Sequence, residues 1–383
     1  MIGDSLRALP EVDNVFIYVA DSLRYDSLPE SVSERGVSVK TVAPALATYM
    51  SMPSIVTGLS PRHHGVRSWG GKIPKQRDFL HDPDVETAYP GDPDDVHHEM
   101  LRMDEARDLD NLDSPWFCYV HSYLSHLPYE IDDLEEFVAE TAGDVERTRE
   151  LYDRAVESVA ADFKEHYRAV RERDELEETL FVFTGDHGEY LGESGLVGHS
   201  SPIRPEGVYV PTVFIHPDLP DAQADGIVRS VDIYPTVVSA TGDSAPERID
   251  GTDLFASQPE YGYTDALAKL NNETALWDAA SVWDEGGGYV QVDSGLGKRL
   301  ATVAGKVGKP SGWQAKHLRR RPQDIPAFAR HYLRGWQTFG TPAVTEQRAR
   351  QLLAEYRDQT PVEPEREELT EAQRENLQEL GYL

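Results

Sequence analysis

Runs of consecutive apolar residues mark four predicted strands, at residues 15–20, 116–120, 180–183 and 212–215. The runs do not alternate between apolar and polar positions, which is typical of parallel strands buried on both faces. Amphipathic patterns separate them. The longest, over residues 149–173, repeats apolar side chains at intervals of three and four positions. Strands that alternate with helices predict an α/β fold with a doubly wound, mostly parallel sheet flanked by helices.

The pattern changes after about residue 255. A glycine-rich turn precedes a short alternating strand at residues 289–293, and a charged segment over residues 363–378 predicts a helix near the end of the chain. We therefore expect two parts. An α/β core spans residues 1–255, and a small C-terminal α+β subdomain with short antiparallel strands and a terminal helix spans residues 256–383.

Polar side chains follow three of the predicted strands within three residues. Asp21 follows the first strand, His121 the second, and Asp186 with His187 the third. In open parallel sheets, ligands bind just beyond the carboxyl ends of the strands. These four side chains are therefore expected to converge on one crevice.

The composition is strongly acidic, with 68 acidic against 37 basic residues and a formal net charge of −31. This charge would repel a polyanion, so a nucleic-acid partner is not expected. Acid spread along the whole chain suits a protein that stays soluble in concentrated salt, and we predict a halophilic source. An ordinary acidic cytosolic protein is the alternative. The sequence shows no leader peptide and no membrane span, which predicts a cytoplasmic location.

One stretch departs from this charge pattern. Residues 298–321 contain eight lysines and arginines and no acidic residue. The interpretation we favour is a solvated loop that offsets the acidic surface. The alternative is a rim that attracts an anionic substrate.

Candidate metal ligands stand at two of the strand ends. A carboxylate and an imidazole in adjacent positions, Asp186 and His187, can both reach one divalent metal, and Gly188 lets the loop bend. Asp21 is a buried carboxylate that a metal would satisfy. The alternatives are a helix cap with a surface histidine, and a salt bridge from Asp21 to Arg24.

A hydroxyl-rich segment supplies candidate nucleophiles. Thr48 and Ser51 precede or begin a predicted helix, where the free amides and the helix dipole favour an alkoxide and an incoming anion. Coordination to a metal would lower the pKa of such a hydroxyl further. A plain helix cap is the alternative role for either residue.

Taken in order, these motifs resemble the sulfatase family of the alkaline phosphatase superfamily. That family has a strand ending in Asp, a nucleophile nine residues before Thr-Gly, and then Pro and His-Gly. Further on it has His-x-Pro-Tyr and Asp-His-Gly-Glu. The matching residues here are Asp21, Thr48, Thr57-Gly58, Pro61, His64-Gly65, His126-Leu127-Pro128-Tyr129 and Asp186-His187-Gly188-Glu189. The resemblance extends over nearly the whole chain and implies an alkaline-phosphatase-like fold, a divalent metal and a covalent nucleophile.

The nucleophile departs from the family pattern. Typical sulfatases convert a Cys or Ser in Cys/Ser-x-Pro-Ser-Arg to formylglycine, but here Ile55 replaces the arginine and Ser51 lies only six residues before Thr57. Thr48 has the family spacing and resembles the nucleophile of phosphodiesterase and phosphoglycerol-transferase members. Against Thr48, Pro53 would fall inside its helix, whereas a helix capped by Ser51 would hold the proline in its first turn. We favour Thr48 and keep Ser51 as the alternate nucleophile.

The metal ligands also differ from the usual set. Ser22 stands where sulfatases usually have a second Asp, His187 where they often have Asn, and His199 near a family lysine. Asp-His resembles phosphatase-like members that prefer manganese or zinc, and imidazole suits those softer metals better than calcium. We predict one divalent ion, with Mn or Zn favoured and Ca or Mg open. Candidates for a second metal site are His97, His98 and His121.

The resemblance implies a role for each site residue. The metal ligands would be Asp21, Thr48, Asp186 and His187. His126 and His199 would bind the ester oxygens and protonate the leaving group, and Arg24 would bind substrate. We predict a metal-dependent hydrolase that cleaves a sulfate or phosphate ester. Its expected substrate is an anionic ester such as a sulfated or phosphorylated sugar. The alternatives are a phosphoglycerol- or phosphoethanolamine-type transferase and a non-catalytic binding protein on a decayed sulfatase fold.

Overall fold

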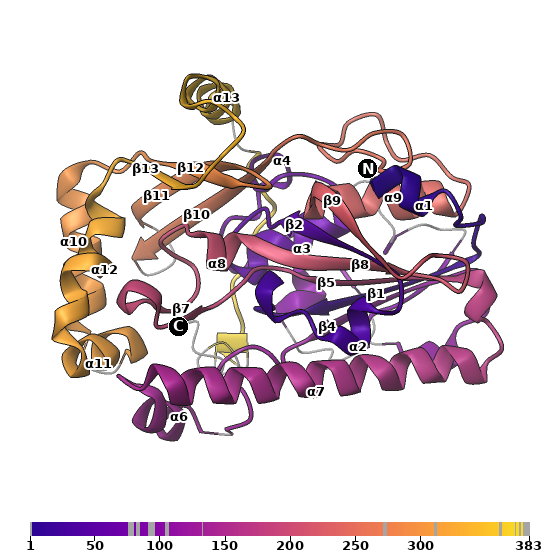
Figure 1. The fold of residues 1–383 in the computed structure, drawn as a ribbon, viewed down its shortest axis with the longest axis horizontal. Helices are drawn as coiled ribbons and strands as arrows, with labels where there is room; N and C mark the ends of the chain where they lie inside the picture. Colours follow the sequence, from indigo (N-terminus) through magenta and orange to yellow (C-terminus); the bar gives the residue numbers. More distant parts are fainter. Residues whose placement is uncertain are drawn as a thin grey trace.

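Two sheets organise the chain in the computed structural model (Figure 1). The structure describes residues 2–75, 80–81, 85–90, 96–103, 107–131, 133–270, 274–309, 312–359, 362–371, 373–374 and 377. A seven-stranded sheet lies at the centre of the N-terminal part, and a four-stranded sheet is built from the C-terminal part. Within these residues, no helix combines the length and apolar character that crossing a membrane requires.

The central sheet is mixed and mostly parallel. Its order is β3 (Glu86–Ala88), β4 (Trp116–Ser122), β1 (Asn14–Ala20), β5 (Thr179–Gly185), β8 (Tyr209–Ile215), β2 (Val37–Val42) and β9 (Ala222–Arg229). Every residue of β1, β4 and β5 is buried, which explains their apolar runs. The predicted fold class, a mostly parallel sheet flanked by helices, is confirmed.

One strand of this sheet runs against the expected direction. The apolar run at residues 212–215 lies in β8, which is antiparallel to both of its neighbours, β5 and β2. β8 occupies an interior position in the sheet and is buried along nearly its whole length. An apolar run therefore reports burial on both faces and carries no information about strand direction.

Helices cover both faces of the central sheet. The long helix α7 (Val145–Glu172) packs Tyr152, Val159 and Phe163 against one face, together with Phe16 and Phe181 from β1 and β5 (Figure 1). The other face is covered by α1 (Ile2–Leu6), α3 (Thr48–Thr57) and α9 (Ile233–Ala240). Shorter helices are α2 (Glu30–Ser33), α4 (Pro61–His64), α5 (Val96–Met100), α6 (Leu134–Thr141) and α8 (Pro205–Val208).

The C-terminal part forms an antiparallel sheet with helices on both faces. Its order is β10 (Gly262–Leu270), β11 (Thr274–Asp284), β12 (Gly287–Val292) and β13 (Trp336–Gly340). The predicted alternating strand lies in β12. Helices α10 (Leu296–Gly308), α11 (Trp313–Arg320) and α12 (Ile325–Leu333) contribute to the core on one face, and α13 (Glu346–Asp358) packs on the other.

The tail is only partly the terminal helix that the sequence predicts. Residues 362–370 lie in no helix or strand and form one isolated β-bridge, between Arg366 and Gly71, and the described positions beyond them, 371, 373–374 and 377, are helical. This segment pairs with the core: the Lys72 amide donates to the Glu365 carbonyl, and the Glu367 amide donates to the Gly70 carbonyl. These long-range backbone bonds override the local helix pattern. The division of the chain at residue 255 remains a prediction.

Candidate active site

Two buried carboxylates meet at the ends of adjacent strands. β1 and β5 pair in parallel with Ala20 opposite Gly185, so Asp21 and Asp186 leave the sheet side by side. Ser22 lies at a positive φ of 64° and joins them: its amide donates to Asp186 Oδ1 (3.1 Å) and its hydroxyl donates to Asp21 Oδ1 (2.8 Å). The residue that replaces the family's second aspartate therefore orients the two carboxylates.

The imidazole of His187 faces the same point. Its Nδ1 lies 3.0 Å from the Gly188 carbonyl oxygen, and donation there leaves Nε2 as a lone-pair donor. Nε2 lies 3.5 Å from Asp186 Oδ2 and 3.8 Å from Asp21 Oδ1. The tautomer set by Gly188 is the one that a metal ligand requires.

Asp21, Asp186 and His187 fit a divalent cation. One ligand atom from each lies within 4.8 Å of the others, and within the described residues this is the one group of its kind. Asp186 Oδ2 is buried and has no hydrogen-bond partner in the described part of the chain. Two buried carboxylates beside a neutral nitrogen are unfavourable without a positive charge between them. Imidazole in the set suits Mn or Zn, but the metal's identity and number remain predictions.

The electrostatic environment of these ligands favours an ionised Asp21 carboxylate and a positive charge beside it. Burial alone would raise the pKa of the Asp21 carboxyl, but the charges of His126 and His187 and a hydrogen bond with His121 hold it well below its ordinary value of 3.8. Burial lowers the pKa of His187, yet Asp186 and Asp21 together raise it above its ordinary value of 6.5. The two carboxylates thus stabilise positive charge at this point, including a proton on His187.

Thr48 places a hydroxyl against this group. It is the first residue of α3, it is fully buried, and its Oγ1 lies 3.2 Å from Asp21 Oδ2 and 3.3 Å from His187 Nε2. The helix N-terminus adds partial positive charge at this point. Thr48 is therefore in contact with two of the three candidate metal ligands.

Ser51 is oriented elsewhere. Its hydroxyl donates to the Ala45 carbonyl oxygen (3.2 Å). The helix begins at Thr48 with Ala47 as its N-cap, so Ser51 is not the cap that would have put Pro53 in the first turn. Pro53 lies inside α3, and the helix continues past it to Thr57. The cost of an interior proline did not shift the start of this helix.

His126 and His199 lie next to His187. The ring centroids of His187 and His199 are 4.5 Å apart, and those of His199 and His126 are 5.1 Å apart. Burial lowers the pKa of His199 to about 3 and also lowers that of His126, so both are neutral hydrogen-bond donors at pH 7. Their proposed role as proton donors remains a prediction.

Glu189 completes this row of side chains. It is fully buried, its Oε2 lies 3.5 Å from His199 Nδ1, and burial raises its pKa to about 8. The Asp-His-Gly-Glu motif thus brings its last residue, as well as its first two, into the site.

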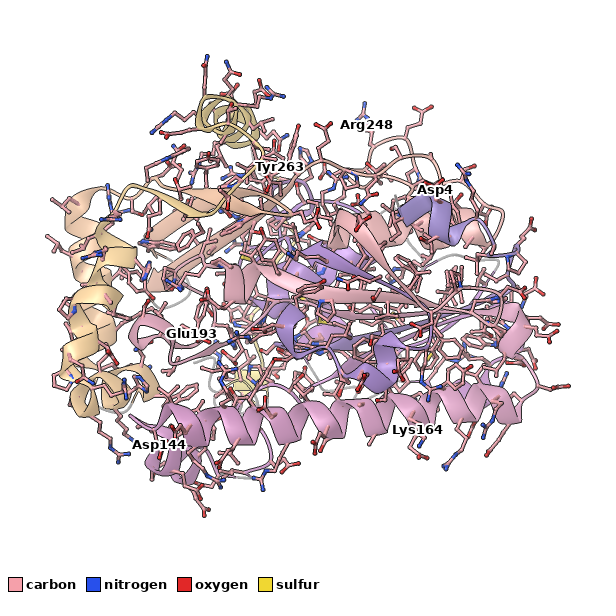
Figure 2. All side chains as sticks on the ribbon, in the orientation of Figure 1. Asp4, Asp144, Lys164, Glu193, Arg248 and Tyr263 are labelled. Carbon is pink, nitrogen blue, oxygen red and sulfur yellow. The ribbon has the colours of Figure 1, made fainter. Side chains whose placement is uncertain are left out.

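Arg24 is bound to carboxylates other than Asp21. Its guanidinium is buried and donates to Asp26 (2.6 and 2.8 Å) and to Glu193 (2.6 Å). The alternative salt bridge between Arg24 and Asp21 is therefore wrong. Glu193 belongs to the loop between β6 (Tyr190–Leu191) and β7 (Val197–Gly198), beside the C-terminal helices (Figure 2). Arg24 anchors this loop, and its role in substrate binding remains a prediction.

The three other candidate histidines separate into two positions. His121 Nε2 lies 3.4 Å from Asp21 Oδ2, and the His97 ring is 5.2 Å from the His121 ring. His98 instead contacts the ring of Tyr89 (4.5 Å). No second group of metal-capable side chains that includes these histidines occurs among the described residues.

One cation near the site was not singled out from the sequence. Lys306 on α10 lies in the basic stretch, and its charge contributes, after burial and the carboxylate and His187 charges, to the pKa of His199. Its Nζ lies 6.0 Å from the ring centroid of Tyr332, whose hydroxyl donates to the Ser201 carbonyl (2.7 Å). Burial lowers the pKa of Lys306 to about 8, and the charge of a second cation, Lys309, also lowers it.

Lys306 also changes the interpretation of residues 298–321. The stretch does not form the solvated loop that we favoured, because most of it lies in α10 and α11. These helices pack into the core of the four-stranded sheet, and the Lys306 Nζ lies 6.0 Å from the ring centroid of the buried Tyr332. The run of basic residues in the sequence indicated that cations could lie near the site. The sequence alone does not say which of its eight lysines and arginines is buried.

Comparison with known proteins agrees with this geometry. The family model described as sulfatase matches residues 8–243. The chain is 30% identical over 394 residues to the low-salt glycan biosynthesis sulfotransferase Agl7 of Haloferax volcanii, and the match covers 97% of this chain and 96% of that protein. The relative thus shares nearly its whole length with this chain and comes from a halophile.

Solved structures share the fold at low sequence identity. The phosphonate monoester hydrolase of Agrobacterium radiobacter has a TM-score of 0.58 and 15% identity, covering 88% of this chain and 98% of that one. BT4656, solved in complex with its substrate D-glucosamine-2-N,6-O-disulfate, has a TM-score of 0.59 and 12% identity, covering 91% and 98%. These likenesses show the alkaline-phosphatase-like architecture.

Proposed function

Because the chain belongs to the sulfatase family, we propose that it is a metal-dependent enzyme that cleaves a sulfate or phosphate ester through a covalent intermediate on Thr48. One observation carries the proposal: the buried Thr48 hydroxyl lies within 3.3 Å of Asp21 and His187, at the N-terminus of α3. An unmodified threonine fits phosphate ester chemistry better than sulfate ester chemistry. The family match is to sulfatases, so both ester classes stay in the proposal.

The first half of the reaction is an in-line transfer to threonine. A divalent cation held by Asp21, Asp186 and His187 would lower the pKa of the Thr48 hydroxyl and supply positive charge beside the ester oxygens. Thr48 Oγ1 loses its proton and forms a bond to sulfur or phosphorus while the bond to the ester oxygen breaks. The neutral imidazole of His126 or His199 takes the proton that Thr48 releases and passes it to the departing oxygen, which leaves as an alcohol.

The surrounding side chains stabilise the charge that is transferred. His199 lies beside His187, His126 lies beside His199, and the Lys306 charge acts on His199; polar and charged groups held in place in this way stabilise developing charge most strongly where water is excluded. In the second half, a water oxygen bonds to sulfur or phosphorus. The threonine ester breaks, sulfate or phosphate leaves, and Thr48 regains its proton.

Hydrolysis of matched nitrophenyl esters tests the proposal. The wild type, Thr48→Ala, Thr48→Ser and Ser51→Ala are assayed on the sulfate, the phosphate monoester, the phosphodiester and the phosphonate, with Mn, Zn or Ca in high salt. We expect turnover that falls by at least about a thousandfold in Thr48→Ala, partly survives in Thr48→Ser and is little changed in Ser51→Ala. Sulfate turnover that survives Thr48→Ala and is lost in Ser51→Ala would contradict the threonine assignment.

A transferase is the second candidate function. The relative from Haloferax volcanii is named a sulfotransferase, and it covers nearly the whole chain. A transferase shares the first half of the reaction, after which an acceptor alcohol replaces water. Assaying nitrophenol release with and without added sugar alcohols, and measuring product masses, separates the two. A new sugar ester at the expense of free sulfate or phosphate would favour the transferase, including one of the phosphoglycerol or phosphoethanolamine type.

The substrate is proposed to be a sulfated or phosphorylated sugar. Support comes from two relatives: BT4656 was solved with a disulfated glucosamine, and the Haloferax protein is named for glycan biosynthesis. The non-catalytic alternative would be expected to have lost metal ligands, whereas Asp21, Asp186 and His187 are present and close together. Sulfated and phosphorylated monosaccharides are therefore the first natural compounds to assay.

A further inference from the structure

The outward face of α10 is apolar. Within the described residues, the large apolar side chains exposed to solvent are Leu124, Leu296, Leu300 and Val362. Two of these four, Leu296 at 59% and Leu300 at 50% exposure, lie one turn apart on α10. The other exposed positions of this helix include Ala301 and Ala304. Scattered apolar side chains on a surface are normal, but a cluster marks a contact site.

The same segment has the opposite charge to the rest of the chain. From residue 294 to residue 323 there is no acidic residue and there are eight lysines and arginines, although 68 of the 383 residues are acidic. Lys298 and Lys309, at the two ends of α10, are exposed, as are Arg319 and Arg320 on α11. The apolar face therefore lies in a basic region of an acidic protein.

Figure 1 places α10 at one end of the molecule, with α11 and α12 beside it. The buried side of α10 holds it to the protein, because Thr302 is buried and Val303 and Val307 pack against the core of the C-terminal sheet. The leucines of the first turns are therefore not needed to attach the helix.

We propose that α10 docks the protein on an anionic lipid surface, with Leu296 and Leu300 inserted among the headgroups. Surface-bound helices combine an apolar face with lysines and arginines at the level of the lipid phosphates. A nucleic acid would leave both leucines in water. A twofold contact between copies through α10 would bring two basic segments together. A lipid surface accommodates both the apolar and the basic side chains.

Vesicle co-sedimentation tests this docking. Vesicles of phosphatidylglycerol and phosphatidylcholine in equal parts are compared with phosphatidylcholine alone, at about 0.1 M and about 2 M KCl. We expect binding to the anionic vesicles only. The double variant Leu296→Ser/Leu300→Ser should weaken binding by at least about tenfold. Val362→Ser, which changes another exposed apolar side chain, is the matched control and should bind as the wild type does.

The charged part of the contact has its own variant. Lys298→Glu/Lys309→Glu should weaken binding strongly in low salt and less in high salt, because salt screens exposed charges. Circular dichroism and thermal unfolding show whether each variant is folded. Thr48→Ala should bind vesicles normally, and the leucine variant should hydrolyse soluble esters normally, so a failure of docking and a failure of the proposed chemistry are distinguishable.

Three outcomes would overturn the docking proposal. The first is a wild-type protein that does not sediment with anionic vesicles. The second is a folded leucine variant that binds them as well as the wild type. The third is a dimer, measured by light scattering, that dissociates in the leucine variant. That result would assign the apolar face to a contact between copies of the chain.

Discussion

Asp21 is in contact with more of the site than any other described carboxylate. Its two oxygens lie within 3.4 Å of Ser22, Thr48 and His121, and within 3.8 Å of His187. Ser22, Thr48 and His121 can each donate a hydrogen bond to it, so the carboxylate is both a candidate metal ligand and the group that fixes Thr48. Neutralising it should affect metal affinity and nucleophile position together.

We expect Asp21→Asn to weaken binding of Mn or Zn by at least about a hundredfold, because the amide loses the charge that holds the ion. Isothermal titration calorimetry on metal-free protein measures this affinity. Asp26→Asn is the control. The Asp26 side chain is largely exposed and pairs with Arg24, so this variant should leave metal affinity nearly unchanged. Equal affinities for wild type and Asp21→Asn would remove Asp21 from the metal site.

Lys306 provides a second test at this scale. If it holds the anionic part of the substrate in the ground state, Lys306→Ala should raise KM about tenfold with a smaller change in kcat. Steady-state kinetics on the best nitrophenyl ester measure both constants, with Lys316→Ala on α11 as the control. An unchanged KM would mean that the Lys306 ammonium does not reach the substrate.

The elements that carry the nucleophile are joined by a buried histidine. His64 at the end of α4 has Nε2 3.1 Å from the Met50 carbonyl of α3, while Nδ1 accepts from the Val66 amide (3.0 Å). This pattern requires a neutral imidazole. Burial lowers the pKa of His64 from 6.5 to about 3. The family's His-Gly motif therefore holds α3 in place through a side chain that must not be protonated.

This pKa has a signed consequence for stability. Between about pH 6.5 and pH 3 the unfolded chain binds a proton at His64 and the folded chain does not, so the free energy of unfolding falls as the pH is lowered. For one proton the slope is up to about 1.4 kcal/mol per pH unit. Urea unfolding at about pH 7 and about pH 5 should show a smaller pH effect in His64→Gln than in the wild type.

The neighbouring histidine gives the opposite sign and serves as the control. A hydrogen bond with Asp250 raises the pKa of His63 above 6.5, so its contribution to stability is complete below 6.5 and is lost as the pH rises through the folded-state pKa. His63→Gln should therefore be most destabilising below pH 6.5. If both variants respond to pH in the same direction, the assignment of these two imidazoles is wrong.

At the scale of the whole molecule, the sequence predicts what depends on local pattern. Buried strands followed by Asp21, Asp186 and His187 specify a sheet edge with polar residues, and the parallel pairing of β1 and β5 brings them together as expected. Contacts between distant segments were not predictable. The direction of β8 and the inward side of α10 depend on partners far away in the sequence.

Net charge also acts at this scale. A chain with a charge of −31 repels itself when folded, and salt screens that repulsion. We expect the thermal midpoint to rise by at least about 5 °C between about 0.1 M and about 2 M KCl. Differential scanning fluorimetry measures it. A midpoint that is flat or falls with salt would contradict adaptation to concentrated salt.

Isolation of the covalent intermediate tests the central claim most directly. The wild-type enzyme is mixed with its best ester, quenched in acid during turnover, digested and mapped by mass spectrometry. The account predicts a sulfuryl or phosphoryl group on the Thr48 hydroxyl and an unmodified Ser51. A group carried by Ser51, or Ser51 found oxidised to formylglycine, would contradict it and return the chemistry to that of typical sulfatases.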